Sequence, residues 1–267
     1  MSTNRPRRPC YARRLIVKQI ERIDLATGRR ERLDDAVVDE APLTITARGR
    51  EVAVTLRTPG HDLELVRGLL HAEVGAAAAT AALRQVAADH VDVDLPADAL
   101  PARSFMATAA CGTCGRVAIA ALEPRARAVT AEDQVSAALI AGLPAALREQ
   151  QAEFAATGGL HAAGLFDLAG RCLVAREDVG RHNALDKVIG AALAASRLPL
   201  TNAIVVLSGR VGYELIEKAV LAGAPIVAAV SAPSRLAIDV AERFGVTVCG
   251  FVRGPRLNVY SHGWRIT

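Results

Sequence analysis

Ala203-Ile204-Val205-Val206-Leu207 is a run of five apolar residues, and the pattern that begins there decides the fold. A helix-like segment over residues 212–222 leads to a second apolar run at 225–230, and another over 235–244 leads to a third at 246–251. Fully apolar runs that alternate with amphipathic helices are typical of parallel strands covered on both faces. The sequence therefore predicts an α/β fold, α+β overall, with a C-terminal βαβαβ sheet and a smaller N-terminal β-rich part.

Ligands of such sheets bind outside the carboxyl ends of the strands. The residues at these ends are Ser208, Gly209 and Arg210 after the first run, residues 231–234 after the second, and Phe251, Val252, Arg253, Gly254, Pro255 and Arg256 at the third. We expect Ser208-Gly209 to open a helix whose exposed amides favour phosphate, and the arginines to add guanidinium forks. Each loop alone could be an ordinary turn, but three at one edge predict a nucleotide or pyrophosphate site.

Two thiols stand three positions apart in Cys111-Gly112-Thr113-Cys114-Gly115. Glycine permits a tight loop and removes bulk beside each sulfur, so we expect both thiols to be approachable. A structural zinc site would need four ligands, of which His161 or His182 could supply one. A thioredoxin-type dithiol would open a helix, which the glycines disfavour. The third interpretation is a nucleophilic thiol that carries sulfur as a persulfide.

The densest polar stretch outside the thiol pair is residues 176–187, which lead into an apolar helix. Asp178 is a candidate N-cap of that helix. His182 and Asp186 are four positions apart, so the carboxylate could orient the imidazole. Capping alone does not explain why so many unlike donors and acceptors gather here, which favours a functional surface. The candidate residues are Asp178, Arg181, His182, Asn183 and Lys187.

The rest of the chain divides into three predicted parts. Residues 1–12 read as a flexible basic tail. Residues 13–125 form a β-rich part with strands at 13–23, 36–47, 51–57 and 89–95, a helix over 61–74 and the thiol pair. Residues 126–267 form the α/β part, which begins with an alanine-rich helical segment over 134–156. We expect Gly142-Leu143-Pro144 to break that segment, and Thr157-Gly158-Gly159 to end it.

Composition excludes several classes of protein. The net charge is only +4, and no aromatic residue apart from Tyr11 interleaves with the arginines near the N-terminus, which argues against nucleic-acid binding. No run reaches the length of a membrane helix, so we expect no membrane partner. Five cysteines with little pairing suit a reducing cytoplasm.

Together these motifs resemble the FdhD family, the sulfur carriers required for formate dehydrogenase. The resemblance rests on the thiol motif, on Glu177 to Lys187 and on shorter matches that run in order from about Ile16 to Tyr260. The shorter matches are residues 40–43, 58–60 with 68–70, 157–163, and Ser208-Gly209-Arg210 with Glu214 and Lys218. Glu73-Val74-Gly75 departs slightly from the Glu-Gly that usually follows the first helix.

The resemblance implies a function and a fold. FdhD proteins accept persulfide sulfur from a cysteine desulfurase and pass it to the molybdenum or tungsten bis-guanine-dinucleotide cofactor before its insertion into formate dehydrogenase. It implies a cytidine-deaminase-like sandwich and a homodimer, although the zinc signature of the deaminases is missing here. It also implies that Cys111 carries the sulfur and that Cys114 assists.

From the two lines of reasoning together, we expect the candidate residues of 176–187 to line a cleft that faces the thiol pair. We expect the strand-end loops to hold the cofactor, for which GDP is a surrogate. The alternative is a zinc- or dithiol-containing chaperone that binds formate dehydrogenase without transferring sulfur.

Overall fold

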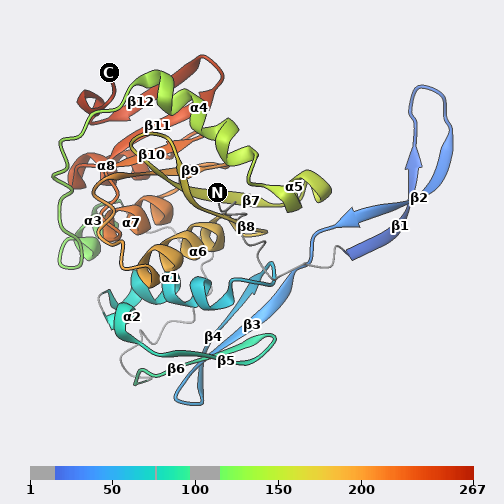
Figure 1. Cartoon of the computed structure of the whole chain (residues 1–267), viewed down its shortest axis with the longest axis horizontal. Helices are drawn as coiled ribbons and strands as arrows, with labels where there is room; N and C mark the ends of the chain where they lie inside the picture. The colour runs from blue at the N-terminus through green and yellow to red at the C-terminus, as the bar shows by residue number, and fades with distance from the viewer. Residues whose placement is uncertain (1–15, 76, 97–114) are drawn as a thin grey trace, which may run out of the picture.

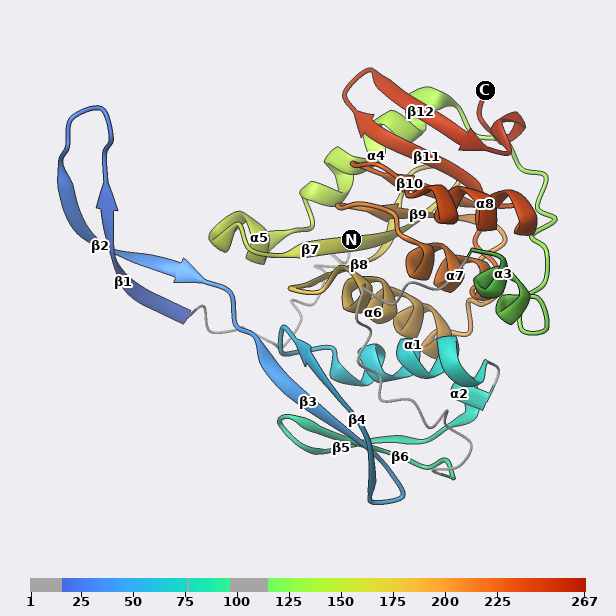
Figure 2. The ribbon, with the colours of Figure 1, turned by 180° about the vertical axis from the view of Figure 1, so that it is seen from behind.

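The computed structural model describes residues 16–75, 77–96 and 115–267 (Figure 1). The described residues form three sheets and the helices that cover them. Figures 1 and 2 show the main body as successive layers: the large sheet, helix α6, helix α1 and a small sheet. The predicted basic tail and both thiols, Cys111 and Cys114, lie outside the described residues.

The large sheet has the strand order β12-β11-β10-β9-β7-β8. Its centre is the predicted βαβαβ unit: β9 (Ala203–Leu207), α7 (Tyr213–Leu221), β10 (Ile226–Ala229), α8 (Arg235–Phe244) and β11 (Thr247–Arg253), with the three strands parallel. This prediction is confirmed. Antiparallel strands flank the unit, with β12 (Arg256–Ser261) on one side, and β7 (His161–Asp167) and β8 (Cys172–Asp178) on the other.

Alternate residues of the large sheet pack into two separate cores. On one face, Val205 and Val227 pack with α6 (Arg181–Ala194), α7 and α8. On the opposite face, Ile204 and Ile226 pack with α4 (Ala137–Arg148). Because both faces are covered, β9 and β10 are apolar at every position, which is why they can be recognised in the sequence.

The small sheet has the strand order β4-β3-β6-β5 and is covered on one face by α1. Its elements are β3 (Ala41–Ala47), β4 (Arg50–Arg57), α1 (Asp62–Val74), α2 (Ala77–Thr80), β5 (Leu83–Ala87) and β6 (His90–Val93). Helix α1 also packs directly on α6, which joins the small sheet to the rest of the body. A Cβ added at Gly68 would lie 2.0 Å from the carbonyl oxygen of Asp186, and one added at Gly190 would lie 1.8 Å from that of Glu64. Glycine is required at both positions because each helix backbone touches the other.

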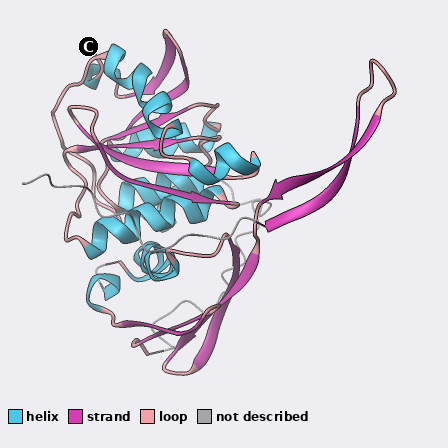
Figure 3. Cartoon of the chain, turned by 45° about the vertical axis from the view of Figure 1, so that its right-hand side comes forward, coloured by secondary structure: helices cyan, strands magenta, loops and turns pink. Residues whose placement is uncertain are grey.

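Strands β1 (Ile16–Ile23) and β2 (Arg30–Val37) form an antiparallel ribbon that projects from the body (Figure 3). The remaining elements are α3 (Gly115–Leu122), α5 (Ala152–Thr157) and the short 3₁₀ helix Gly263–Arg265. Leu122 belongs to the core between the large sheet and α6–α8. The division of the chain at residue 125 and the likeness to cytidine deaminases stay predictions.

The structure corrects three local expectations. Helix α4 runs through Pro144 because Ile140, Leu143 and Leu147 pack on the sheet along one face, and the segment breaks only after Arg148. Ser208-Gly209 does not open a helix, since α7 begins at Tyr213 with Gly212 as its N-cap. The run 36–47 is not one strand, because β2 ends at Val37 and β3 begins at Ala41.

Candidate functional site

A cavity of about 550 Å³ lies at the carboxyl ends of β9 and β10. Ser208 and Val230, which directly follow these strands, form part of its wall. The other walls come from α4, α5 and the segment 158–161 that leads into β7. Its volume falls in the range of about 300–1,000 Å³ that is typical of small-molecule sites. The cavity lies where the sheet topology predicts a ligand.

Ser208 fixes the wall of the cavity to β7. Its backbone N–H donates to the carbonyl of Ala162 over 3.0 Å, and its Oγ accepts from the N–H of Ala162 at 2.8 Å. Gly209 follows beside the imidazole of His161, where an added Cβ would lie 3.3 Å from Nδ1. Burial lowers the pKa of His161, and the charge of Arg181 lowers it further, so a neutral imidazole lines the cavity.

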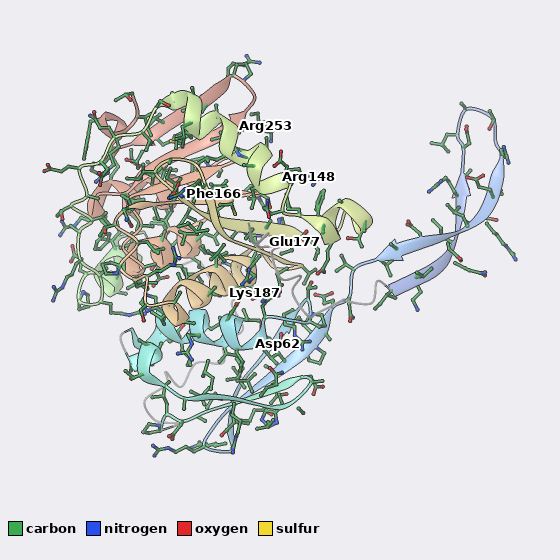
Figure 4. The ribbon with its side chains drawn as sticks, viewed as in Figure 1. Asp62, Arg148, Phe166, Glu177, Lys187 and Arg253 are labelled. Atoms are coloured by element: carbon green, nitrogen blue, oxygen red, sulfur yellow. The ribbon has the colours of Figure 1, made fainter. Side chains whose placement is uncertain are left out.

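Two hydrogen bonds connect the end of β11 to the residues that follow β10. Arg253 donates from Nε to the carbonyl of Val230 over 2.9 Å, and the N–H of Phe251 donates to the carbonyl of Ser231 over 3.2 Å. Arg253 is therefore held beside a residue of the cavity wall, while its side chain is exposed and its terminal nitrogens form no hydrogen bond with the described residues. Figure 4 labels Arg253 and Arg148, the arginine of the α4 wall.

The other residues of this loop differ in what they can contact. Arg256 begins β12 and is exposed, as are Gly254 and Pro255 at the hairpin turn. Phe251 is 40% exposed and has a positive φ of 50°, so its ring is not part of the core. Val252 is fully buried in the core between the sheet and α4, so its side chain is structural. Arg210, after β9, is exposed.

Polar residues at the start of α6 form a buried network of hydrogen bonds and one ion pair, which we call the clamp. Its residues are Asp178, Asn183 and Lys187. Asp178 is fully buried and is not the N-cap, which is Gly180. One carboxylate oxygen of Asp178 accepts from the N–H of Gly180 at 2.9 Å, and the other is paired with Lys187 Nζ at 2.6 Å and accepts from the N–H of Thr58 at 3.2 Å. Lys187 Nζ also donates to the carbonyl of Thr58 over 2.9 Å, and Asn183 Nδ2 donates to the carbonyl of Leu56 over 2.8 Å.

These contacts assign Asp178, Asn183 and Lys187 to the junction between α6 and the turn from β4 to α1. Their polar groups are directed at the protein's own backbone and at one another. Whether this junction faces the thiol pair lies outside the described residues, so that part of the expectation stays a prediction.

Arg181 and His182 are only partly buried and differ from the clamp residues. His182 Nδ1 lies 3.2 Å from Glu214 Oε2 on α7, and burial, helped by the charges of Arg181 and Lys218, lowers its pKa to about 4. Asp186 does not orient this imidazole, because it pairs with Lys218 at 2.6 Å. Burial raises the pKa of Asp186 to about 6. Arg181 Nε is buried and has no hydrogen-bond partner among the described residues.

Sequence reasoning missed the α4–α5 wall of the cavity. Arg148, Gln151 and Phe154 lie in an alanine-rich segment that was expected only to be helical. The signal that could have located them is the place where the helix ends, since Arg148 is the last residue of α4 and Gln151 is the N-cap of α5.

The structure gives no position for the thiol pair, which lies outside the described residues. Cys114 directly precedes Gly115, the first residue of α3. In the described part of the chain, no cluster of three or more His, Cys, Asp or Glu side chains is arranged to hold a metal ion. The helices described there are all too short or too polar to cross a membrane.

Comparison with known proteins gives a consistent result. The model of the FdhD/NarQ family matches residues 38–267. A sulfur carrier protein FdhD of Nocardia farcinica is 44% identical over 88% of this chain and 89% of its own length. The sulfur carrier protein FdhD of Sulfolobus acidocaldarius is 39% identical over 94% of this chain and 98% of its own length. A crystal structure of a protein from Desulfotalea psychrophila, assigned as a formate dehydrogenase accessory protein, superposes with a TM-score of 0.77 at 25% identity and covers 95% of this chain and 99% of its own.

Proposed function

The chain belongs to the FdhD/NarQ family, and from that premise we propose that it is a sulfur carrier that serves formate dehydrogenase. In this proposal a cysteine desulfurase donates the sulfur, and the molybdenum or tungsten bis-guanine-dinucleotide cofactor receives it before insertion into formate dehydrogenase. The cofactor is a substrate of the carrier. The carrier acts as a homodimer in the reducing cytoplasm, where free thiols persist.

The thiol chemistry falls to Cys111, with Cys114 assisting. The thiolate of Cys111 attacks the terminal sulfur of the desulfurase persulfide, and the electron pair of the broken S–S bond leaves with the desulfurase cysteine as a thiolate. The carrier then holds one extra sulfur as a persulfide. A thiolate is the attacking species, so a lowered pKa of Cys111 would speed this step.

The observation that carries the cofactor part of the proposal is the cavity at the ends of β9 and β10. It offers Ser208 on one wall, and Arg253 is fixed beside the lining residue Val230. A cavity of about 550 Å³ suits one nucleotide end of the cofactor. The guanidinium of Arg253 keeps its terminal N–H groups for phosphate oxygens, since only Nε is used by the Val230 carbonyl.

Calorimetric titration with GDP tests this site. A charge-assisted contact contributes roughly 1.5–3 kcal/mol, so Arg253→Ala is expected to weaken GDP binding by about ten- to a hundredfold. Arg171→Ala is the control, because Arg171 is an exposed arginine on the turn between β7 and β8 that pairs with Asp167. Equal GDP affinity in the Arg253→Ala variant and the unmodified chain would show that the nucleotide does not bind at this strand end.

A further inference from the structure

The outer wall of the cavity is a guanidinium stacked on an aromatic ring. Arg148, the last residue of α4, lies with its guanidinium carbon 3.8 Å from the centre of the Phe154 ring. Both residues line the cavity. Arg148 forms no ion pair with any residue in the described part of the chain. Stacking occupies the face of the guanidinium and leaves its N–H groups, which lie in its plane, able to donate.

A buried side chain lies on the same wall. Gln151 is only 5% exposed and lines the cavity. Its backbone is used within the α4–α5 connection: its N–H donates to the carbonyl of Arg148 over 3.1 Å, and its carbonyl accepts from the N–H of Ala155 at 2.9 Å. Its side-chain amide has no hydrogen-bond partner among the described residues. The amide nitrogen and oxygen are not among the fully buried polar atoms that lack a partner, so they stay open to a ligand that fills the cavity.

Glu177 holds this wall in place. Its carboxylate accepts from the N–H of Phe154 at 2.8 Å and from the N–H of Glu153 at 3.1 Å, which satisfies the free amides at the start of α5. The position of the Phe154 ring, and with it that of Arg148, is therefore tied to the end of β8. Glu177 is a positioning residue, since it acts through Phe154.

We propose that Arg148 and Gln151 bind the base of the nucleotide end and select guanine over adenine. This inference rests on the proposed function, which places a nucleotide in this cavity. Guanine presents two acceptors, O6 and N7, where adenine presents N7 and an amino donor. An arginine only donates, so Arg148 matches the guanine edge and opposes the adenine amino group. The amide of Gln151 both donates and accepts, so it can accept from the N1–H of guanine.

The two sides of the cavity suit different parts of a nucleotide. The strand-end side supplies Ser208, with Arg253 bonded to the lining residue Val230 at its margin, for phosphates, and the α4–α5 side supplies the guanidinium of Arg148 and the amide of Gln151 for a base. The neutral imidazole of His161 lines the cavity beside Gly209 and adds no positive charge there.

Parallel calorimetric titrations of the full chain with GDP and ADP test the proposal. The unmodified chain is expected to prefer GDP. A good arginine–guanine pair contributes about 1–3 kcal/mol of discrimination, so Arg148→Lys, which keeps the charge but loses the fork, should reduce the preference by roughly ten- to a hundredfold. Gln151→Met, which keeps the shape but removes the amide, should weaken GDP binding. Gln150→Ala, at the exposed neighbouring position, should change neither affinity.

Two failures are distinguishable. If the unmodified chain binds no GDP, or if Arg253→Ala binds it equally well, the nucleotide site of the proposed function is wrong. If GDP binds and Arg253→Ala weakens it, while Arg148→Lys and Gln151→Met keep the affinities of the unmodified chain, base selection by this wall is overturned. Both substituted side chains keep their approximate size, and circular dichroism of each variant verifies that the fold is intact.

Discussion

Removing the charge of Lys187 tests the clamp between α6 and the β4–α1 turn. Lys187 Nζ is paired with Asp178 at 2.6 Å, and both side chains are fully buried. Lys187→Met keeps most of the side-chain length but leaves the Asp178 carboxylate without a cation. It also removes the donor to the carbonyl of Thr58.

The expected cost follows from this geometry. Breaking a buried ion pair by removing one partner costs about 3–5 kcal/mol, because the remaining charge is buried without compensation. Asp178 keeps the N–H groups of Thr58 and Gly180 and the amide of Asn183, which places the expected cost near the lower figure. The double variant Asp178→Asn with Lys187→Met buries no charge, so it should be less destabilised than the sum of the two single variants.

Urea unfolding followed by circular dichroism measures each free energy of unfolding. The control is Arg235→Met, which breaks a pair with Asp239 whose side chains are 94% and 47% exposed, and which should cost less than about 1 kcal/mol. A cost for Lys187→Met as small as that of the control, or strict additivity in the double variant, would refute the clamp.

Two further predictions concern the helix layer. Gly190→Ala should destabilise the fold by about 1–3 kcal/mol or more, because the added Cβ would meet the carbonyl of Glu64. Gly142→Ala in α4 places its Cβ in open space and should stabilise the fold by about 0.5–1 kcal/mol. Thermal unfolding of the two variants compares these effects. The pKa of His182 is lowered from 6.5 to about 4, mainly by burial, because the folded protein disfavours the charged imidazole. The free energy of unfolding should therefore be highest above pH 6.5 and should fall by up to about 3 kcal/mol as the pH drops towards 4. Asp186, whose pKa is raised to about 6, opposes this loss below pH 6, and urea unfolding across this range should show a shallower acid slope in His182→Gln than in the unmodified chain.

The central fold could be predicted because burial on both faces makes β9 and β10 apolar throughout and buries the first four residues of β11, Thr247 to Gly250. Strands with exposed faces gave a weaker signal. The charged strand β2 and the largely exposed β5 were not predicted, since pairing with β1 and β6 and not burial holds them. Pro144 was expected to break α4, but the packing of that helix on the sheet outweighs the local preference.

The site could be predicted only in part. Parallel topology was enough to bring Ser208 and Arg253 to one edge of the sheet. The clamp could not be foreseen, because Asp178 meets Thr58, a residue 120 positions earlier in the chain. Arg148 and Gln151 were not singled out, because the helix was expected to break at Gly142-Leu143-Pro144 and not after Arg148, and because Glu177 and the strand ends that complete the cavity come from other segments.

The most direct test of the account is the mass of the peptide that contains Cys111. After incubation with a cysteine desulfurase and cysteine, mass spectrometry under non-reducing conditions should find one added sulfur atom on Cys111 in the unmodified chain, and the label should fall sharply in Cys111→Ala. Labelling of Cys111→Ala to the level of the unmodified chain would show that another residue accepts the sulfur. No added sulfur on any peptide of the unmodified chain would contradict its role as a persulfide carrier.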